Sequence, residues 1–424
     1  MDTPTLHKPT RSSQSNSRSE VPSLPLSVFF TVPCTICYNP DSTPFDEGSS
    51  LPRAVPHPAT FPVAAHDDQD RRFANAFRIL KEAIAAHAFP AASIAVTHQG
   101  KLVAHHAFGH FTNEPGAPEP VPDTLFDLAS VTKAIATTTM AMILYQRGLL
   151  DLEMPVIAVV GEFAGEDPRR DEVTLRMLLA HSSGLPAYEK LFLKAHTREE
   201  LLEAAYSTAL VNDPGSHAEY SDIAFIILSV ALERLADESI DRFCQREIFG
   251  PLGMTHTTFK PAPELRSSIP PTADDQAFRH RIIQGEVHDE NASVLGGVAA
   301  HAGLFATAHD VATFAHIMLQ GGHPVLRPET LALFTKREAS PPGTSRTLGW
   351  DTPSAPSQSG RYFSASSYGH LGYTGTSLWI DPERDLSITL LTNRTWPDNK
   401  NQAIRQIRPR FHDAIIAALS KHES

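Results

Sequence analysis

The sequence predicts an α/β protein of the α+β type, in which an antiparallel β-sheet is flanked by the N- and C-terminal helices and carries an inserted all-helical lobe. Three observations support this prediction. A helical pattern and then a hairpin pattern follow residue 67, the same patterns return in reverse order near the C-terminus, and helical periodicity dominates between them. With 424 residues, 41% of them hydrophobic, the chain is long enough to bury a sizeable core.

The N-terminal part of the chain divides near residue 67. Residues 1–66 are rich in Ser, Thr and Pro and lack a sustained period, so we expect a disordered or processed leader. The folded domain is expected to span 67–424. Apolar residues of its first helix recur at three- and four-residue steps, at Phe73, Phe77, Leu80, Ile84 and Ala88. The strand-like runs 93–97 and 101–104 then predict a hairpin around a Gly-containing turn.

The middle of the chain, from about 130 to 340, is predicted to be the inserted helical lobe. Its helical stretches are 134–145, 175–180, 198–206, 223–236 and 308–319. Strand-like runs return at 377–380 and 386–392, and 402–419 is helical again. Because sequential strands tend to pair and chain ends often lie together, we expect one sheet built from both ends. A ligand site is then expected in a cleft between the sheet and the lobe.

The charge and hydropathy of the chain limit the classes of molecule that it is expected to bind. The formal net charge is −12, so the basic surface that nucleic acids and anionic membranes require is missing, and a small-molecule or peptide substrate is expected. No stretch approaches roughly 18 consecutive apolar residues, which predicts no integral membrane segment. Residues 21–38 are interrupted by Pro25 and Pro33, so there is no convincing signal peptide. A cytoplasmic and an exported, periplasmic location both stay open, as does the oligomeric state.

The sequence predicts neither a metal nor an organic cofactor. The three cysteines, Cys34, Cys37 and Cys244, form no disulfide framework. His288, Asp289 and His301 are possible metal ligands by type, but no tight ligand spacing such as H-E-x-x-H occurs.

The chemistry is expected at Ser130, which stands at the predicted start of a helix with Lys133 one turn later on the same face. A lysine can take the proton of a serine if its pKa falls from about 10.4 towards roughly 7 to 8, and burial would supply that shift. The ordinary alternative is a helix-capping serine followed by a surface lysine. This is the only Ser-x-x-Lys in the chain.

Two further segments supply partners for this pair. Tyr220 lies in a loop before the predicted helix 223–236, so its phenol can relay a proton between Ser130 and a leaving group. The alternative for Tyr220 is a core tyrosine with one hydrogen-bonded tip. The run 369–375, GHLGYTG, directly precedes a predicted strand, and its glycines would let a substrate approach the strand backbone.

With these three motifs in this order, the chain resembles the family of class C β-lactamases, penicillin-binding DD-peptidases and related esterases over about residues 69–420. Three further segments are similar to the same family, at 178–186, 251–254 and 296–304. The resemblance implies an antiparallel sheet with flanking helices and a helical lobe. It also implies that Ser130 is acylated, that Lys133 and Tyr220 share the proton transfers, and that His370 supplies a positive or hydrogen-bonding group beside the substrate.

The resemblance further places an oxyanion between the backbone N–H groups of Ser130 and Tyr373, with Gly372 beside it. Two positions depart from the family pattern, because Asp222 stands where Asn is common and Leu371 where Thr is common. An ionised Asp only accepts hydrogen bonds, so Asp222 could hold Lys133 but would contact a substrate amide carbonyl poorly. Leu371 lacks a hydroxyl for a substrate carboxylate. Both departures favour esters or unusual peptides over β-lactams.

The resulting prediction is a serine hydrolase that forms an acyl-enzyme on Ser130 and hydrolyses an ester or amide, as an esterase, a DD-peptidase of carboxypeptidase type or a β-lactamase. The alternative is a penicillin- or peptidoglycan-binding scaffold with the same fold and no turnover. The natural acyl donor and the deacylation base stay open. The run 180–184 resembles the nucleophile elbow of α/β-hydrolases, but a helical pattern precedes it where that elbow needs a strand.

Overall fold

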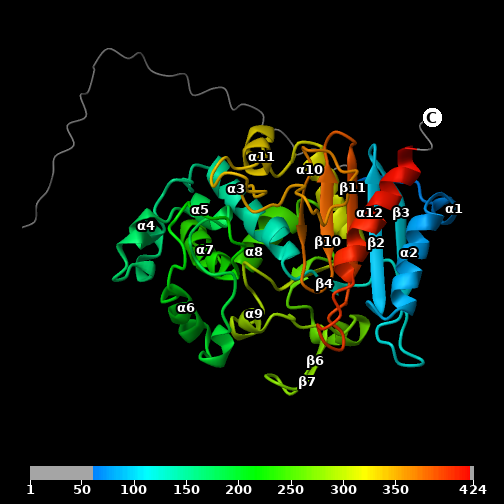
Figure 1. The fold of residues 1–424 in the computed structure, drawn as a ribbon, viewed down its shortest axis with the longest axis horizontal. Helices are drawn as coiled ribbons and strands as arrows, with labels where there is room; N and C mark the ends of the chain where they lie inside the picture. Colours follow the sequence, from blue (N-terminus) through cyan, green and yellow to red (C-terminus); the bar gives the residue numbers. More distant parts are fainter. Residues whose placement is uncertain (1–60, 421–424) are drawn as a thin grey trace, which may run out of the picture. The chain divides into compact units, whose positions relative to one another are not determined.

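The computed structural model describes residues 61–420, and its main sheet has six strands in the order β1-β3-β2-β11-β10-β9. The strands are β1 (Val63–Ala64), β2 (Ala91–His98), β3 (Lys101–Gly109), β9 (Tyr368–Leu371), β10 (Ser377–Asp381) and β11 (Leu386–Thr392). Only the pair β1 and β3 is parallel. The predicted antiparallel sheet is confirmed, because β2 from the N-terminal half pairs with β11 from the C-terminal end (Figure 1).

The hairpin between β2 and β3 turns at Gln99 and Gly100, both of which have positive φ, at 50° and 73°. Two such residues match the right-handed twist of the flanking strands. Its register sets Ile94 opposite His106.

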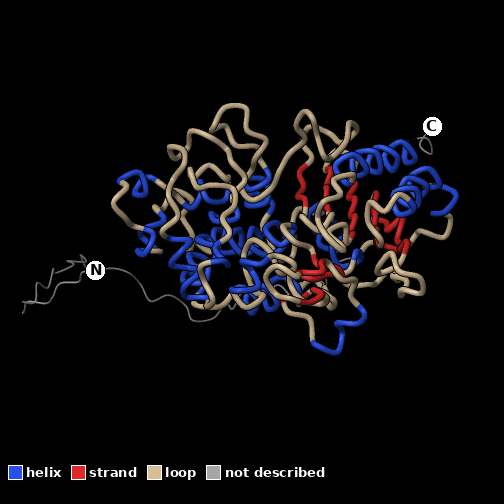
Figure 2. The backbone as a smooth tube through the Cα atoms, turned by 60° about the horizontal axis from the view of Figure 1, so that its bottom comes forward, coloured by secondary structure: helices blue, strands red, loops and turns tan. Residues whose placement is uncertain are grey.

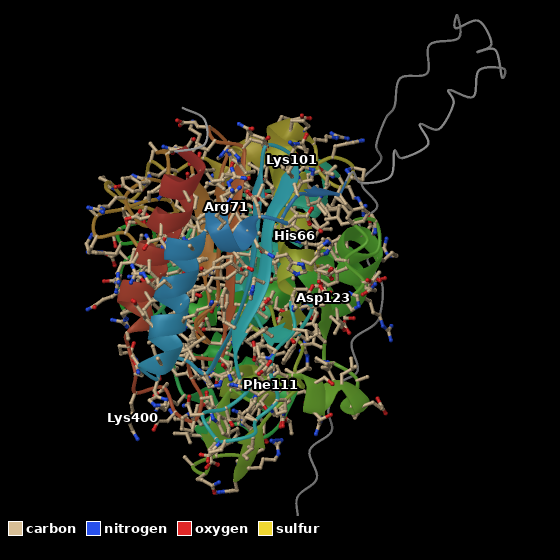
Figure 3. All side chains as sticks on the ribbon, turned by 90° about the vertical axis from the view of Figure 1, so that its right-hand side faces the viewer. His66, Arg71, Lys101, Phe111, Asp123 and Lys400 are labelled. Carbon is tan, nitrogen blue, oxygen red and sulfur yellow. The ribbon has the colours of Figure 1, made fainter. Side chains whose placement is uncertain are left out.

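Helices α2 (Ala74–Ala85) and α12 (Ile404–Ser420) cover one face of this sheet. They lie side by side against the strands (Figures 1 and 3). The residues buried on this face follow the helical and the strand period: every third or fourth residue is buried in α2, and every second residue of β2 faces these helices. The buried residues include Phe73, Phe77, Leu80, Ala92, Ile94 and Val96. The amphipathic pattern therefore predicted this layer correctly.

Helix α10 (Ala308–Leu319) packs on the opposite face, against β2, β10 and β11. The sequence placed 308–319 in the inserted lobe, and that placement is wrong. Ten of the twelve residues of α10 are buried, because the sheet covers one side of the helix and the helical region covers another. An all-round apolar helix shows no preferred face from which its neighbours could be predicted.

The remaining helices gather to one side of the sheet (Figure 2). The α-helices are α1 (Gln69–Arg72), α3 (Thr139–Gln146), α4 (Val156–Val159), α5 (Leu175–Leu179), α6 (Arg198–Tyr206), α7 (Asp222–Ala236), α8 (Ile240–Cys244), α9 (Glu290–Val294) and α11 (Pro328–Thr335), of which α1 lies by β3. Two π-helical segments are η1 (Lys133–Thr138) and η5 (Gln245–Phe249). Four 3₁₀ segments are η2 (Gly161–Phe163), η3 (Pro168–Glu172), η4 (Leu191–Leu193) and η6 (Pro263–Ser268).

The sequence predicted an all-helical middle region, and this prediction is wrong. The middle region also holds a sheet of β4 (Phe126–Asp127), β8 (Leu304–Ala306) and β5 (Thr258–Phe259), and a pair of β6 (Ala273–Asp275) and β7 (Arg281–Ile283). Strands of two or three residues are too short to show alternation in the sequence.

The described part of the chain begins before residue 67. Val63 and Ala64 form β1 and pair with Lys101 and Leu102, so residues 61–66 belong to the folded domain rather than to the predicted leader. Residues 1–60, with the rest of that leader, Cys34 and Cys37, lie outside the described residues. Between residues 61 and 420, every helix is too short or too polar to cross a membrane.

Candidate active site

Ser130 directly precedes a helix that begins at Val131 and runs into the π-helical segment η1, as its predicted place at a helix start requires. Ala129 has a φ of 47°, in the left-handed region. Oδ1 of Asp127, in β4, accepts the N–H of Ala129 at 2.7 Å and holds this conformation. A strained residue and a π-helical turn beside one serine are features that cluster at functional sites.

Lys133 is completely buried and points at Ser130. Its Nζ donates to Oδ1 of Asp222 at 2.6 Å, to the carbonyl oxygen of His301 at 2.9 Å and to Oγ of Ser130 at 3.1 Å. An ammonium group has three N–H donors, and each one has an acceptor here. The contact between the predicted pair is therefore present, and Asp222 holds Lys133.

The charge state of Lys133 differs from the sequence prediction. Burial acts to lower the pKa of Lys133, but the adjacent carboxylate of Asp222 outweighs burial, and the pKa is raised. The expected fall of this pKa is wrong for the free protein. Lys133 is an ammonium group paired with Asp222, and the serine hydroxyl accepts a hydrogen bond from it.

Tyr220 lies over the same ammonium group, with Nζ of Lys133 4.9 Å from the ring centroid. Burial raises the pKa of Tyr220, although Lys133 and Ser130 act to lower it, so the side chain is a neutral phenol. The guanidinium of Arg346 lies 5.2 Å from the centroid of this ring. Arg346 could not be predicted from the sequence, because the loop that carries it contains no motif.

His181 explains one of the family-like segments, 178–186. Its ring lies 4.6 Å from that of Tyr220, and its Nδ1 accepts the backbone N–H of Ser221 at 3.1 Å. Burial lowers the pKa of His181 well below the usual range, so the ring is neutral. His181 thus contacts Tyr220 and the backbone of the next residue, and no strand precedes the serines at 182 and 183, which are buried.

His370 in β9 lies beside Tyr220, with ring centroids 5.9 Å apart. Its Nδ1 is 2.8 Å from the carbonyl oxygen of Leu371, so Nδ1 carries the proton and Nε2 is an acceptor. Nε2 is buried and has no hydrogen-bond partner among the described residues. Burial, followed by Lys133, lowers the pKa of His370 to about 3. A positively charged His370 is therefore wrong, and the hydrogen-bonding alternative stays a prediction.

The loop after β9 is tied to the backbone just before Ser130. The hydroxyl of Thr376 donates to the carbonyl oxygen of Leu128 at 2.9 Å. The hydroxyl of Thr374 donates to the backbone carbonyl oxygen of Asp127 at 2.8 Å. Tyr373, whose side chain is half exposed, lies in this loop. Among the backbone hydrogen bonds of residues 61–420, none is donated by the N–H of Ser130 or Tyr373. Both groups are free to bind an oxyanion.

The sequence suggested that the glycines of 369–375 let a substrate approach the strand. Close packing is a second reason for glycine at position 372. A Cβ at this position would lie 1.9 Å from Oγ1 of Thr376 and 2.4 Å from the carbonyl oxygen of Leu128. From α12, the buried guanidinium of Arg408 donates to the carbonyls of Gly372, Thr376 and Gly375 at 2.8, 2.9 and 3.2 Å. The sequence indicated neither this role of Arg408 nor that of Asp127.

Of the two departures from the family pattern, only Asp222 reaches Lys133. Leu371 packs against the hydrophobic cluster formed with α2 and α12, where a side chain contributes apolar contact. Two of the candidate metal ligands contact each other, with Nε2 of His301 2.8 Å from Oδ1 of Asp289, whereas Nδ1 of His288 has no hydrogen-bond partner among the described residues. Burial acts to raise the pKa of Asp289, but His301 outweighs it and the pKa falls to about 2. Residues 61–420 contain no group of three or more potential ligands arranged for a metal ion.

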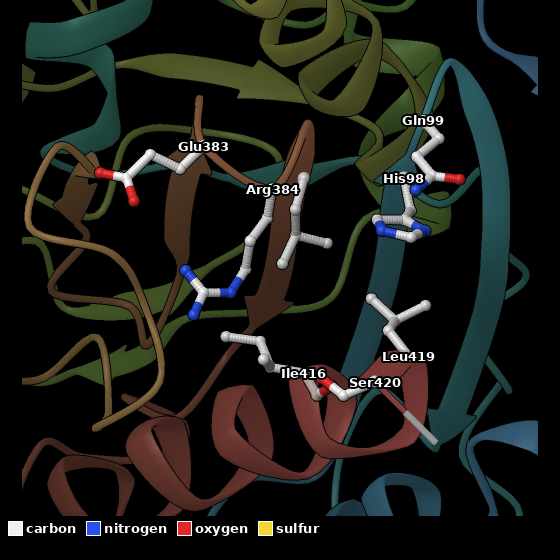
Figure 4. A pocket seen from close by; sticks show the side chains of 8 residues that line it. His98, Gln99, Glu383, Arg384, Ile416, Leu419 and Ser420 are labelled. Carbon is white, nitrogen blue, oxygen red and sulfur yellow. The ribbon is translucent and has the colours of Figure 1, made fainter. Parts of the chain in front are cut away.

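A depression of about 220 Å³ lies at the other end of β10 and is separate from this site (Figure 4). Its lining includes His98, Arg384 and Leu419. It contains neither the serine nor the lysine of the candidate site.

An antiparallel sheet beside a helical region, with a serine and a buried lysine in contact at a helix start and a tyrosine above them, defines a serine hydrolase of the penicillin-recognising class. The chain belongs to the beta-lactamase family, whose sequence model matches residues 76–409. The protein is therefore a hydrolase of this family.

Among curated relatives, a provisionally named D-alanyl-D-alanine carboxypeptidase of Salmonella agona is 31% identical over 347 residues, which cover 72% of this chain and 79% of that protein. An N-acetylmuramyl-L-alanine amidase of Bacillus subtilis is 30% identical over 349 residues, covering 73% and 78%.

Solved structures share the fold at lower identity. EstCE1, a hydrolase with promiscuous acyltransferase activity, superposes with a TM-score of 0.68 at 22% identity and covers 82% of this chain and 99% of its own. Simvastatin synthase from Aspergillus terreus gives 0.65 at 22% identity, covering 82% and 99%. A penicillin-binding protein homologue from Caulobacter crescentus gives 0.66 at 20% identity, covering 84% and 98%.

Proposed function

We propose that Ser130 attacks the carbonyl carbon of an ester or amide and forms an acyl-enzyme, which water then hydrolyses. The observation that carries this proposal is the 3.1 Å contact between Oγ of Ser130 and the buried Nζ of Lys133. Membership of the beta-lactamase family supports the same reaction class. The intact pair also argues against a scaffold that only binds, because such a protein has no need of a buried lysine at a serine.

The proton of Ser130 needs an acceptor, and Lys133 is already an ammonium group. Lys133 can take that proton only as it passes one of its own to the carboxylate of Asp222, 2.6 Å away. After attack, Lys133 is still an ammonium group, Asp222 is a neutral acid and the substrate oxygen carries the negative charge. The N–H groups of Ser130 and Tyr373 are proposed to bind that oxygen.

Collapse of the intermediate breaks the bond to the leaving group, which must receive a proton. The phenol of Tyr220 is proposed to donate it and to recover a proton from Lys133, which is in turn reprotonated by Asp222. These transfers return all three side chains to their starting states. Hydrolysis of the acyl-enzyme follows the same path in reverse, with water in place of the leaving group.

A covalent label tests the nucleophile. Treatment with a fluorophosphonate and, separately, with penicillin should add mass to the peptide that contains Ser130, as measured by mass spectrometry. Ser130→Ala should abolish both labelling by the fluorophosphonate and turnover of short p-nitrophenyl esters, whereas Ser216→Ala, at an exposed serine of the loop before Tyr220, should leave both intact. Unlabelled wild-type protein, or an Ser130→Ala variant that hydrolyses esters at the wild-type rate, would refute the proposal.

A further inference from the structure

His181 stands at the end of helix α5 in a backbone conformation that favours glycine. Its N–H donates to the carbonyl of Leu178 at 3.3 Å, and the next N–H along the chain donates to the carbonyl of Met177 at 2.8 Å. This pair of hydrogen bonds closes the helix with His181 in the left-handed region, at a φ of 57°. Glycine is the usual residue there because a Cβ disfavours the conformation. A histidine at this position therefore destabilises the helix end unless its side chain forms compensating contacts.

The contacts of His181 lie on both sides of Tyr220. Its backbone carbonyl accepts the N–H of Glu219 at 2.9 Å, and its Nδ1 accepts the N–H of Ser221 at 3.1 Å. The residues before and after Tyr220 are thus bound to one and the same residue. Two fixed neighbours limit the φ and ψ of Tyr220, which set the direction in which the phenol leaves the backbone.

The imidazole ring of His181 is itself held in place. It stacks on Phe225 of α7, with ring centroids 4.9 Å apart and an angle of 27° between the planes, and its centroid lies 4.6 Å from that of Tyr220. His181 is 2% exposed. A buried ring in contact with two aromatic side chains cannot turn without displacing them, so Nδ1 keeps its direction toward Ser221.

Only one of the two ring nitrogens of His181 forms a hydrogen bond. Nδ1 is an acceptor, so Nε2 carries the proton, and Nε2 is buried without a hydrogen-bond partner among residues 61–420. A buried donor without an acceptor is unfavourable, and a hydrocarbon ring would avoid it. What a hydrocarbon ring cannot replace is the acceptor at Nδ1, which is directed at the residue after Tyr220.

The start of α7 is anchored without the side chain of His181. The hydroxyl of Ser221 donates to the carbonyl of Pro186 at 2.7 Å, and the N–H of Asp222 donates to the carbonyl of Ala187 at 2.9 Å. These bonds persist whatever residue stands at position 181. Substitution of His181 should therefore loosen Tyr220 and leave the lysine–aspartate pair intact.

We propose that His181 is a positioning residue for the proton relay, which holds the phenol of Tyr220, through Nδ1 and the backbone carbonyl, where the leaving group must receive its proton. This inference rests on the proposed acyl transfer at Ser130 and on the relay by Tyr220. In this scheme His181 touches neither the substrate nor Ser130 and acts only through Tyr220. Its loss should therefore matter most for leaving groups that depart poorly without a proton.

Esters of one acyl group with different leaving groups test this inference. Release of p-nitrophenolate from its acetyl ester needs no proton, whereas phenyl acetate and ethyl acetate release progressively more basic oxygens. The value of kcat/KM reports acylation for all three esters. His181→Phe keeps an aromatic ring and lacks the acceptor. It should raise the ratio of kcat/KM for p-nitrophenyl acetate to that for ethyl acetate by roughly tenfold or more, since a positioned general acid contributes about 10²- to 10⁴-fold. An equal fall for all three esters would show a purely structural role and overturn the inference.

A double variant shows whether His181 acts through Tyr220. Tyr220→Phe alone should raise the same ratio by the larger factor. Adding His181→Phe to it should then change the ratio by less than about twofold. Two factors that multiply in the double variant would mean that the two residues act independently, which contradicts the proposal.

Conservative variants locate the hydrogen bond. His181→Asn places an amide oxygen where Nδ1 stands and tolerates the left-handed backbone, so its ratio should stay near that of the wild type. His181→Gly suits the backbone but has no acceptor; it should raise the ratio, and it replaces His181→Phe if that variant does not fold by circular dichroism. His217→Phe, the same change at an exposed position of the loop before Tyr220, should leave the ratio unchanged. An Asn variant with the ratio of the Gly variant refutes the role of Nδ1.

Labelling separates this inference from the proposed function. Each variant is treated with the fluorophosphonate before the esters are compared. Labelled Ser130 together with an unchanged ratio in His181→Phe, or in Tyr220→Phe, refutes the positioning role and leaves the acyl transfer standing. Absence of label in the wild-type protein refutes both.

Discussion

Replacing Arg408 by Met removes the group that holds the loop after β9 in place. Arg408 is 5% exposed, and its guanidinium donates to three carbonyls of residues 372–376, at 2.8 to 3.2 Å. No carboxylate neutralises it among the described residues, and burial lowers its pKa to about 9. The substitution removes this unfavourable burial of charge, but it leaves the carbonyl of Gly375 without a donor, whereas the carbonyls of Gly372 and Thr376 each keep a backbone N–H donor.

The balance of these effects sets the expected loss. The one orphaned acceptor costs about 1 to 3 kcal/mol, and relief of the buried charge offsets part of that cost, so we expect about 1 kcal/mol less stability. Because Tyr373 lies within the same loop, displacement of its N–H should also lower kcat by roughly 10²- to 10³-fold. Stability is measured by urea unfolding and kcat with a p-nitrophenyl ester.

Arg410→Met is the matched control, because Arg410 lies on the same helix and is exposed. It should change neither quantity. An Arg408→Met protein with the urea midpoint and the kcat of the wild type would refute the inference that Arg408 holds the loop after β9 in place. Reduced stability with unchanged kcat would show that Arg408 stabilises the fold without placing Tyr373.

Three further predictions concern residues around Ser130. Gly372→Ala should lose most ester turnover because its Cβ would lie 1.9 Å from Oγ1 of Thr376, whereas Gly161→Ala, with open space around it, should not. Tyr220→Phe should keep the fold by circular dichroism and lower kcat about 10²-fold by removing the proton relay, and an unchanged kcat would exclude that role. Burial raises the pKa of Asp127 from 3.8 to about 6, so its contribution to stability is complete below pH 3.8 and is lost as the pH rises through 6. The free energy of unfolding of the wild type, measured with urea, should therefore fall by about 3 kcal/mol between pH 3.5 and 7.5 relative to that of Asp127→Asn. Parallel pH profiles of the two proteins would contradict the raised pKa of Asp127.

The elements that the sequence predicted well are those whose burial follows a simple period. Helix α6 begins and ends at the predicted residues 198 and 206, and strand β11 at 386 and 392. In α2 and β2 one face is buried against a single neighbour, so the spacing of apolar residues reports the contact. Helix α10 lies between two layers and lacks such a face, which is why its place against the sheet could not be predicted.

The candidate site divides along the same line. The contact between Ser130 and Lys133 could be predicted because Ser130 directly precedes a helix and Lys133 lies on its first turn. Arg346 and Arg408 could not, because they reach the site from a loop and from the last helix, and no local pattern links them to Ser130. Long-range hydrogen bonds to backbone carbonyls, such as those of Arg408, leave no trace in the identity of the residues that accept them.

The direction of the pKa shift of Lys133 is the feature of the site that the sequence predicted wrongly. Asp222 is the reason. Burial alone would favour a neutral Lys133, as the sequence suggested, but a carboxylate at 2.6 Å changes the sign of the shift. An Asn at this position would contribute no charge, so only Tyr220 would then oppose the effect of burial on the pKa of Lys133. In the proposed mechanism, Asp222 therefore accepts the proton that Lys133 passes on when Ser130 attacks. A carboxylate oxygen in place of an amide nitrogen at this one position thus changes the group to which the proton of Ser130 is proposed to pass.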